Sequence, residues 1–142
     1  DLGSVGRTRG FATRVDIPIA IIDKRRPKAN VSEIMNIIGN VDGKRVILVD
    51  DMIDTAGTIC KAADMLMDNG AASVRAVATH AVLSGKAYEN IEKSKLTEVI
   101  FTDSIPQKQP CSKIKVLPIA PMFADTIRNI YEHKSISDHF LM

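Results

Sequence analysis

Short runs of apolar residues alternate along the chain with segments in which apolar residues recur at every third or fourth position. Residues 46–49 form an unbroken aliphatic run, which is typical of a strand buried on both faces of a parallel sheet. The other apolar runs predict strands at residues 17–22, 31–38, 74–82, 98–102 and 114–117. The helical spacing predicts helices at residues 5–15, 59–67, 86–93 and 121–133.

The order of these elements predicts one α/β domain that spans residues 1–142, with a mostly parallel, doubly wound sheet, flanking helices and a small hairpin. The turn-rich residues 39–43 predict that the strand at residues 31–38 turns back toward Arg45 to form this hairpin. In the last helix, the side chains expected to face the core are Met122, Ala124, Ile127 and either Ile130 or Tyr131.

Composition and charge argue against several classes of protein. A formal net charge of +2, with 25% charged residues, gives no basic excess of the kind that indicates nucleic-acid binding. No apolar run approaches the roughly 20 residues needed to span a bilayer. No signal peptide is visible either, so we expect a cytoplasmic protein without a membrane partner. Cys60 and Cys111 are far apart and match no metal-binding spacing, which favours ordinary thiols over a disulfide framework.

Acidic residues directly follow the central apolar run. Asp50 and Asp51 come where a strand at residues 46–49 would leave the sheet, and open α/β folds bind ligands beyond the carboxyl ends of their parallel strands. Neighbouring carboxylates can accept hydrogen bonds from two vicinal hydroxyls or hold a divalent cation. The alternative is a capped junction between strand and helix, but a cap requires only one acid. These two acids and Asp54 repel one another unless a cation or a polyol is present, so the pattern favours a binding role.

A turn of small and hydroxyl-bearing residues comes next. Its residues are Asp54, Thr55, Ala56, Gly57 and Thr58. Small side chains let backbone N–H groups converge, the hydroxyls add donors, and a helix expected from Ile59 adds its positive end. This combination suits a phosphate group. Together with the acids beside it, the turn predicts a site for a sugar phosphate.

A cluster of cations follows the strand expected at residues 17–22. Residues 23–28 carry four of them, including Lys24 and Arg26, and Pro27 indicates a loop. Such a run is often only a solubilising surface. Beside a sugar-phosphate site, however, Lys and Arg can stabilise the charge that develops on a transferred phosphoryl group. We therefore expect this loop to take part in the chemistry.

Five motifs resemble, in order, those of ribose-phosphate pyrophosphokinases. They are DLGSV, DKRRP, VILVDDMIDTAGT, ATHAVLSG and SIS. The central motif also resembles the phosphoribosyl pyrophosphate loop of type I phosphoribosyltransferases, but those enzymes would need a base-binding hood, which we do not find in the sequence. The resemblance covers essentially the whole chain. It implies the carboxyl-terminal half of such a kinase, with a type I phosphoribosyltransferase-like fold.

The resemblance also implies an activity. The family transfers the β,γ-diphosphoryl group of Mg-ATP to O1 of ribose 5-phosphate, which gives phosphoribosyl pyrophosphate and AMP. It implies Mg²⁺ as the cofactor, ribose 5-phosphate and ATP as partners, an ATP site mostly outside this chain, and a homo-oligomer at full length. Lys24 and Arg26 are the implied catalytic residues, and the acids with the turn at residues 54–58 are the implied substrate site. Because the chain opens at Asp1 without an initiator Met, we expect a fragment that is inactive alone.

Further residues gain possible roles from the same resemblance. Asp1 would supply an acid to the metal site, although a solvated terminal carboxylate is an equal alternative. Ser135, Ser137 and Phe140 match the spacing of a segment that contributes to a regulatory phosphate or ADP site, although a frayed tail is equally consistent with a Ser-rich end. His80 falls at the end of a predicted strand and is more simply an interior residue, so it is left out of the site.

Two interpretations of different class stay open. In the first, the chain is the ribose 5-phosphate and diphosphoryl-transfer domain of a complete enzyme. In the second, it belongs to a non-catalytic sugar-phosphate-binding or regulatory homologue. The presence of Lys24 and Arg26 argues against the second interpretation.

Overall fold

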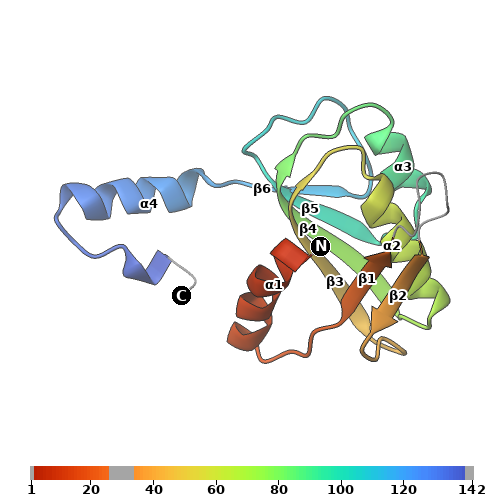
Figure 1. Cartoon of the computed structure of the whole chain (residues 1–142). Helices are drawn as coiled ribbons and strands as arrows, with labels where there is room; N and C mark the ends of the chain where they lie inside the picture. Colours follow the sequence, from red (N-terminus) through yellow and green to blue (C-terminus); the bar gives the residue numbers. More distant parts are fainter. Residues whose placement is uncertain (1, 26–33, 140–142) are drawn as a thin grey trace.

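Four parallel strands form the central sheet of the computed structural model, which describes residues 2–25 and 34–139 (Figure 1). The strands are β3 (Arg45–Ile53), β4 (Ser73–Ala81), β5 (Glu98–Thr102) and β6 (Ile114–Leu117), adjacent in that order. Every neighbouring pair is parallel, and Leu48 pairs with Ala76, which pairs with Val99. The predicted α/β class and parallel sheet are therefore confirmed. The prediction that residues 46–49 are buried on both faces is wrong, because β3 is an edge strand of the sheet and Ile47 is exposed.

Two helices cover one face of this sheet. They are α2 (Gly57–Asp68) and α3 (Ala87–Lys93), each of which follows a strand and returns along the sheet (Figure 1). Alternate residues of a strand point to the same face, so the covered face supplies every second residue to the core. The fully buried residues include Ala63, Leu66, Val74, Ala76, Ile91 and Val99. The carboxyl ends of β3 and β4 are thereby fixed against the starts of the two helices.

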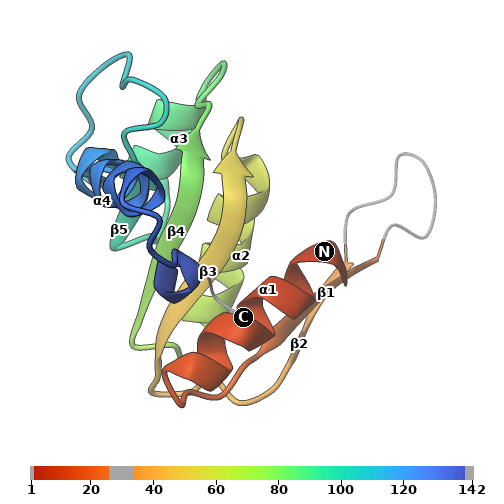
Figure 2. The same cartoon turned by 90° about the vertical axis from the view of Figure 1, so that its left-hand side faces the viewer.

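The β3 edge of the sheet faces the amino-terminal part of the chain. Helix α1 (Leu2–Arg14) lies beside this edge, and its Ala12 is buried (Figure 2). Strands β1 (Ile21–Arg25) and β2 (Ile34–Ile38) form an antiparallel hairpin next to it. A small antiparallel hairpin is therefore present beside the sheet, as predicted.

The pairing within the hairpin differs from the prediction. Strand β2 pairs with β1, which precedes it, and does not pair back toward Arg45. The turn before β3 is held by the turn after α2, where Gly43 N–H donates to Gly70 C=O at 2.8 Å, so the chain that leaves β2 runs to this turn before it enters β3. Strand β1 also starts at Ile21, after Pro18, and continues to Arg25, so the first part of the predicted basic loop is a strand.

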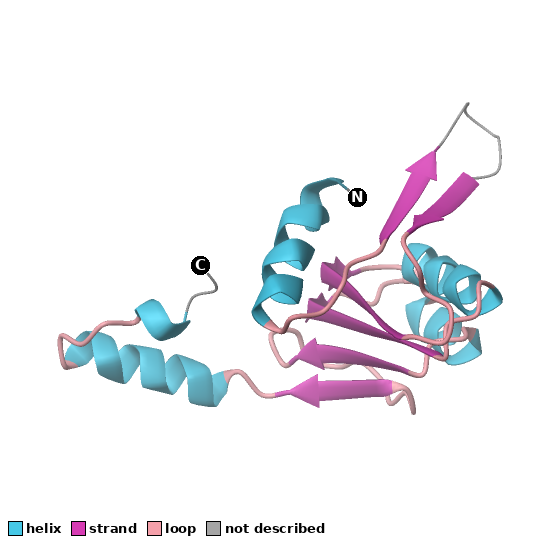
Figure 3. Cartoon of the chain, turned by 90° about the horizontal axis from the view of Figure 1, so that it is seen from below, coloured by secondary structure: helices cyan, strands magenta, loops and turns pink. Residues whose placement is uncertain are grey.

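The last helix differs most from expectation. Helix α4 (Ala120–Tyr131) and the short helix η1 (Ser137–His139) project from the body of the molecule, on the side of the sheet opposite α2 (Figures 1 and 3). None of the α4 residues is buried. The prediction that Met122, Ala124, Ile127 and Ile130 or Tyr131 face the core is therefore wrong for this chain. The amphipathic pattern is present, but no element of the described chain packs against it closely enough to bury it.

The structure contains no helix, among its described residues, that is long and apolar enough to cross a membrane.

Candidate functional site

The acids at the end of β3 lie within the strand. Strand β3 continues to Ile53, which pairs with Ala81, so the expectation that the strand stops before Asp50 and Asp51 is wrong. The cause is the matching length of β4, which extends the hydrogen-bonded register past both acids. Successive side chains of a strand point to opposite faces, so the two carboxylates do not lie on the same face. Both residues are exposed.

The turn after β3 presents a row of backbone N–H groups. Ala56 has the left-handed conformation, with φ 61° and ψ 1°, and α2 begins directly after it at Gly57. Within the described residues, the N–H groups of residues 55–59 donate to no protein acceptor, and the first one that does is that of Cys60, which donates to Ala56 C=O at 3.0 Å. Unpaired N–H groups at a helix start, together with the positive end of the helix, favour an anion. The turn therefore offers donors of the kind that a phosphate site requires, and the phosphate site stays a prediction.

The third acid has a different environment from the first two. The Ser84 hydroxyl donates to the Asp54 carboxylate, and Ser84 N–H donates to Asp54 C=O at 3.2 Å. Asp54 therefore holds the turn to the segment that follows β4. This contact relieves part of the repulsion that the sequence alone suggested among the three acids.

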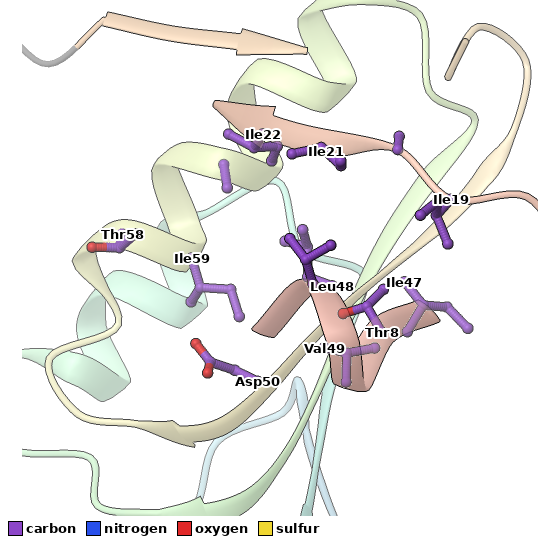
Figure 4. Close-up of a pocket in the computed structure, with 13 residues that line it drawn as sticks. Thr8, Ile19, Ile21, Ile22, Ile47, Leu48, Val49, Asp50, Thr58 and Ile59 are labelled. Atoms are coloured by element: carbon purple, nitrogen blue, oxygen red, sulfur yellow. The ribbon is translucent and has the colours of Figure 1, made fainter. Parts of the chain in front are cut away.

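An apolar cavity lies beside the turn. It has a volume of ≈ 230 Å³ and is bordered by residues of α1, β1, β3 and α2, with Ile22, Leu48 and Ile59 among its walls (Figure 4). Asp50 and Thr58 supply polar groups at this cavity. Its walls are mainly aliphatic, so the cavity itself is not suited to a sugar phosphate. The open side of the turn is the better place for such a ligand.

Of the other predicted site residues, the structure describes Lys24, Ser135 and Ser137. Lys24 lies in β1, whereas Arg26 falls outside the described residues, as do Asp1 and Phe140. Ser135 and Ser137 lie beyond α4, on the part of the chain that projects from the body (Figure 1). Their hydroxyl oxygens are 2.8 Å apart, and Ser137 N–H donates to Ser135 Oγ at 3.1 Å. The two serines thus form a local turn of their own.

His80 lies at the same edge of the sheet as the acids. It is exposed, and its Nδ1 is 2.9 Å from Ser104 Oγ. Ser104 Oγ in turn donates to Thr79 C=O at 3.1 Å. The preference for an interior histidine is therefore wrong, because Thr79 and His80 are exposed near the carboxyl end of β4. Sequence reasoning also missed Ser104, whose contact with His80 joins residues far apart in the chain.

Metal-ligating and thiol side chains are the remaining candidates for chemistry in the described residues. No group of three or more His, Cys, Asp or Glu side chains in them is arranged to hold a metal ion. Cys60 is buried, and this burial raises the pKa of its thiol. Burial also raises the pKa of the Cys111 thiol, with a further contribution from its hydrogen bond to Glu92. Neither thiol is therefore activated as a nucleophile.

Comparison with known proteins agrees with this geometry. The chain is 55% identical over 141 residues to the ribose-phosphate pyrophosphokinase of Wolinella succinogenes, covering 99% of this chain and 46% of that relative. It is 57% identical over 140 residues to the enzyme of the same name from Helicobacter hepaticus, covering 99% of this chain and 45% of that relative. The chain therefore spans slightly less than half the length of the curated relatives that it matches.

A solved structure shows the same fold. The phosphoribosylpyrophosphate synthetase from Mycobacterium smegmatis superposes with a TM-score of 0.81 at 38% sequence identity, covering 92% of this chain and 43% of that chain. The family model described as the phosphoribosyl synthetase-associated domain matches residues 26–141. This match includes the sheet, the acids and the turn, and the resemblance seen in the sequence motifs is confirmed. The chain belongs to the phosphoribosyl synthetase-associated domain family.

Proposed function

We propose that the chain is the ribose 5-phosphate-binding half of a ribose-phosphate diphosphokinase. The complete enzyme would transfer diphosphate from ATP to ribose 5-phosphate, which gives phosphoribosyl pyrophosphate and AMP for nucleotide biosynthesis. The observation that carries the proposal is the row of unpaired N–H groups at residues 55–59, directly beyond the exposed acids of β3. A sugar phosphate carries a phosphate group for the N–H groups and hydroxyl groups for the acids.

The 5-phosphate would bind at the start of α2. Ala56 and Gly57 carry no bulky side chain, so an anionic oxygen can approach their N–H groups closely, and the positive end of α2 adds to the attraction. Asp51 is the acid best suited to the ribose hydroxyls, because Asp50 lies at the aliphatic cavity. A carboxylate accepts such hydrogen bonds strongly, since it carries the full charge.

Transfer of diphosphate requires cations that this turn lacks. We assign that role to Lys24 and Arg26, on the basis of the DKRRP motif, and we place Asp1 and Mg²⁺ with the nucleotide. Lys and Arg would stabilise the charge that develops on the transferred group. The ATP site lies mostly outside this chain in the proposal, which also assigns the regulatory role to Ser135, Ser137 and Phe140.

The full-length protein is proposed to be a cytoplasmic homo-oligomer. The exposed apolar side chains of α4, such as Ile127 at 64% exposure, support association with further protein. Light scattering after size-exclusion chromatography measures the mass of the assembly directly.

The test compares the isolated 142-residue chain with the full-length protein. We expect the full-length protein to release AMP from ATP only when ribose 5-phosphate is present. The isolated chain should bind ribose 5-phosphate weakly and release no AMP. If the isolated chain releases AMP, the proposal that the ATP site lies mostly outside this chain is wrong. If the full-length protein binds ribose 5-phosphate without releasing AMP, it is a non-catalytic homologue.

A further inference from the structure

The turn between β3 and α2 is held from one side by the segment that follows β4. Three successive carbonyl groups accept hydrogen bonds from this segment. Leu83 N–H donates to Ile53 C=O at 3.1 Å, and Ser84 N–H donates to Asp54 C=O at 3.2 Å. The side-chain amide of Asn90, in α3, donates to Thr55 C=O at 2.9 Å.

These bonds fix the direction of the N–H groups in the turn. In a trans peptide, the C=O and the N–H of the same peptide unit point in opposite directions, and the described chain contains no cis peptide. The Asn90 amide therefore holds Thr55 C=O toward α3 and turns Ala56 N–H away from α3. Ser84 does the same for the peptide that ends in Thr55 N–H. Both N–H groups lack a protein acceptor within the described residues.

The supporting segment is itself constrained. Leu83 has a positive φ of 47° although it is a large residue, and it is only 2% exposed. Such a conformation is unfavourable for a non-glycine residue and persists only where the surroundings determine it. It allows the successive N–H groups of Leu83 and Ser84 both to point toward the end of β3, where they donate to Ile53 C=O and Asp54 C=O. The strain is therefore placed where it orients the turn.

Asn90 differs from the other two donors because its bond comes from a side chain. It joins residues 35 positions apart, and it acts on the peptide next to the left-handed Ala56. The left-handed conformation is less favourable for alanine than for glycine, so the peptide between Thr55 and Ala56 would rotate more readily without this hydrogen bond. We propose that Asn90 is a positioning residue that holds Ala56 N–H toward the 5-phosphate of the substrate. This inference rests on the proposed function of the turn.

Kinetics of the full-length protein test this role. The isosteric variant Asn90→Asp removes the donor and brings a second acceptor against Thr55 C=O, and Asn90→Ala removes the side chain. We expect both to raise KM for ribose 5-phosphate about 3- to 10-fold, which corresponds to one net hydrogen bond. KM for ATP and kcat should change by less than about twofold, because no reacting atom is touched.

Two controls separate positioning from folding. Asn90→Gln keeps an amide donor and should restore part of the affinity for ribose 5-phosphate. Glu89→Gln changes the neighbouring residue of α3, which pairs with Lys93, and should leave both KM values unchanged. Melting temperatures of all variants show whether a change in KM merely follows a loss of stability.

The outcomes distinguish the two proposals. If Asn90→Asp keeps the wild-type KM for ribose 5-phosphate, or lowers only kcat, the positioning role is overturned while the proposed function stands. If the wild-type protein does not use ribose 5-phosphate, the proposed function fails and the positioning role fails with it. A raised KM in Asn90→Asp, with partial recovery in Asn90→Gln, supports the positioning role.

Discussion

Replacing Gly57 with valine should weaken binding of ribose 5-phosphate without unfolding the protein. Gly57 is the first residue of α2, and its φ lies outside the left-handed region. A Cβ built on it would have Thr55 Oγ1 as its nearest neighbour, at 3.9 Å, which is ordinary van der Waals contact. The protein therefore has room for a Cβ at this position. A phosphate bound at the N–H groups of residues 55–59, in contrast, would leave no room for the valine side chain.

The size of the effect follows from the lost hydrogen bonds. A hydrogen bond to a charged group contributes about 1.5–3 kcal/mol, so the loss of one bond to the phosphate should raise Kd about 10- to 150-fold. Folding should change far less. Glycine is among the poorest helix-forming residues, so valine at Gly57 costs the helix nothing and the free energy of unfolding should stay within about 1 kcal/mol.

Calorimetric titration with two ligands provides the assay. Wild-type and Gly57→Val proteins are titrated with ribose 5-phosphate and with ribose, which lacks the phosphate. Wild type should prefer ribose 5-phosphate strongly, and the variant should lose most of this preference while its affinity for ribose is retained. Gly57→Ala should give an intermediate value. An unchanged Kd for ribose 5-phosphate in folded Gly57→Val would show that the phosphate does not bind at this turn.

Three further predictions test other parts of the argument. Asp51→Asn should weaken binding of the sugar by something on the order of 1.5–3 kcal/mol, and calorimetry showing unchanged affinity would remove Asp51 from the ribose site. In the full-length enzyme, Lys24→Ala and Arg26→Ala should each lower kcat roughly 10²- to 10³-fold, far more than they raise KM for ribose 5-phosphate. If either changed only KM, the basic segment would be a binding surface. Hydrogen bonds from Lys115, the larger contributor, and from Arg75 lower the pKa of Glu98. The ionised carboxylate therefore stabilises the fold fully above pH 4.5, the ordinary pKa of the group, and this stabilisation is lost as the pH falls through the lowered pKa. Glu98→Gln should therefore lower Tm at neutral pH, and the difference from wild type should shrink in acid.

The sequence by itself determined the elements that depend on local pattern. The aliphatic run at residues 46–49 placed a strand correctly within β3, although not its burial, and the helical spacing after Gly57 placed α2 within two residues of its observed start. The glycine turn and its acids indicated a phosphate and a polyol, because these chemical requirements are met by neighbours in the sequence. The motif order also identified the family that the comparisons confirm.

Tertiary structure decided which of these elements meet. Periodicity shows that α4 has an apolar face, but it does not supply a partner, and the described chain leaves that face exposed. Periodicity also does not specify which strands pair. The partner of β2 and the extension of β3 past Asp50 and Asp51 therefore depend on the neighbouring strands. The contact between Asn90 and Thr55 spans 35 positions and has no local signal. Such contacts arise because folding the sheet brings the end of β3 against α3.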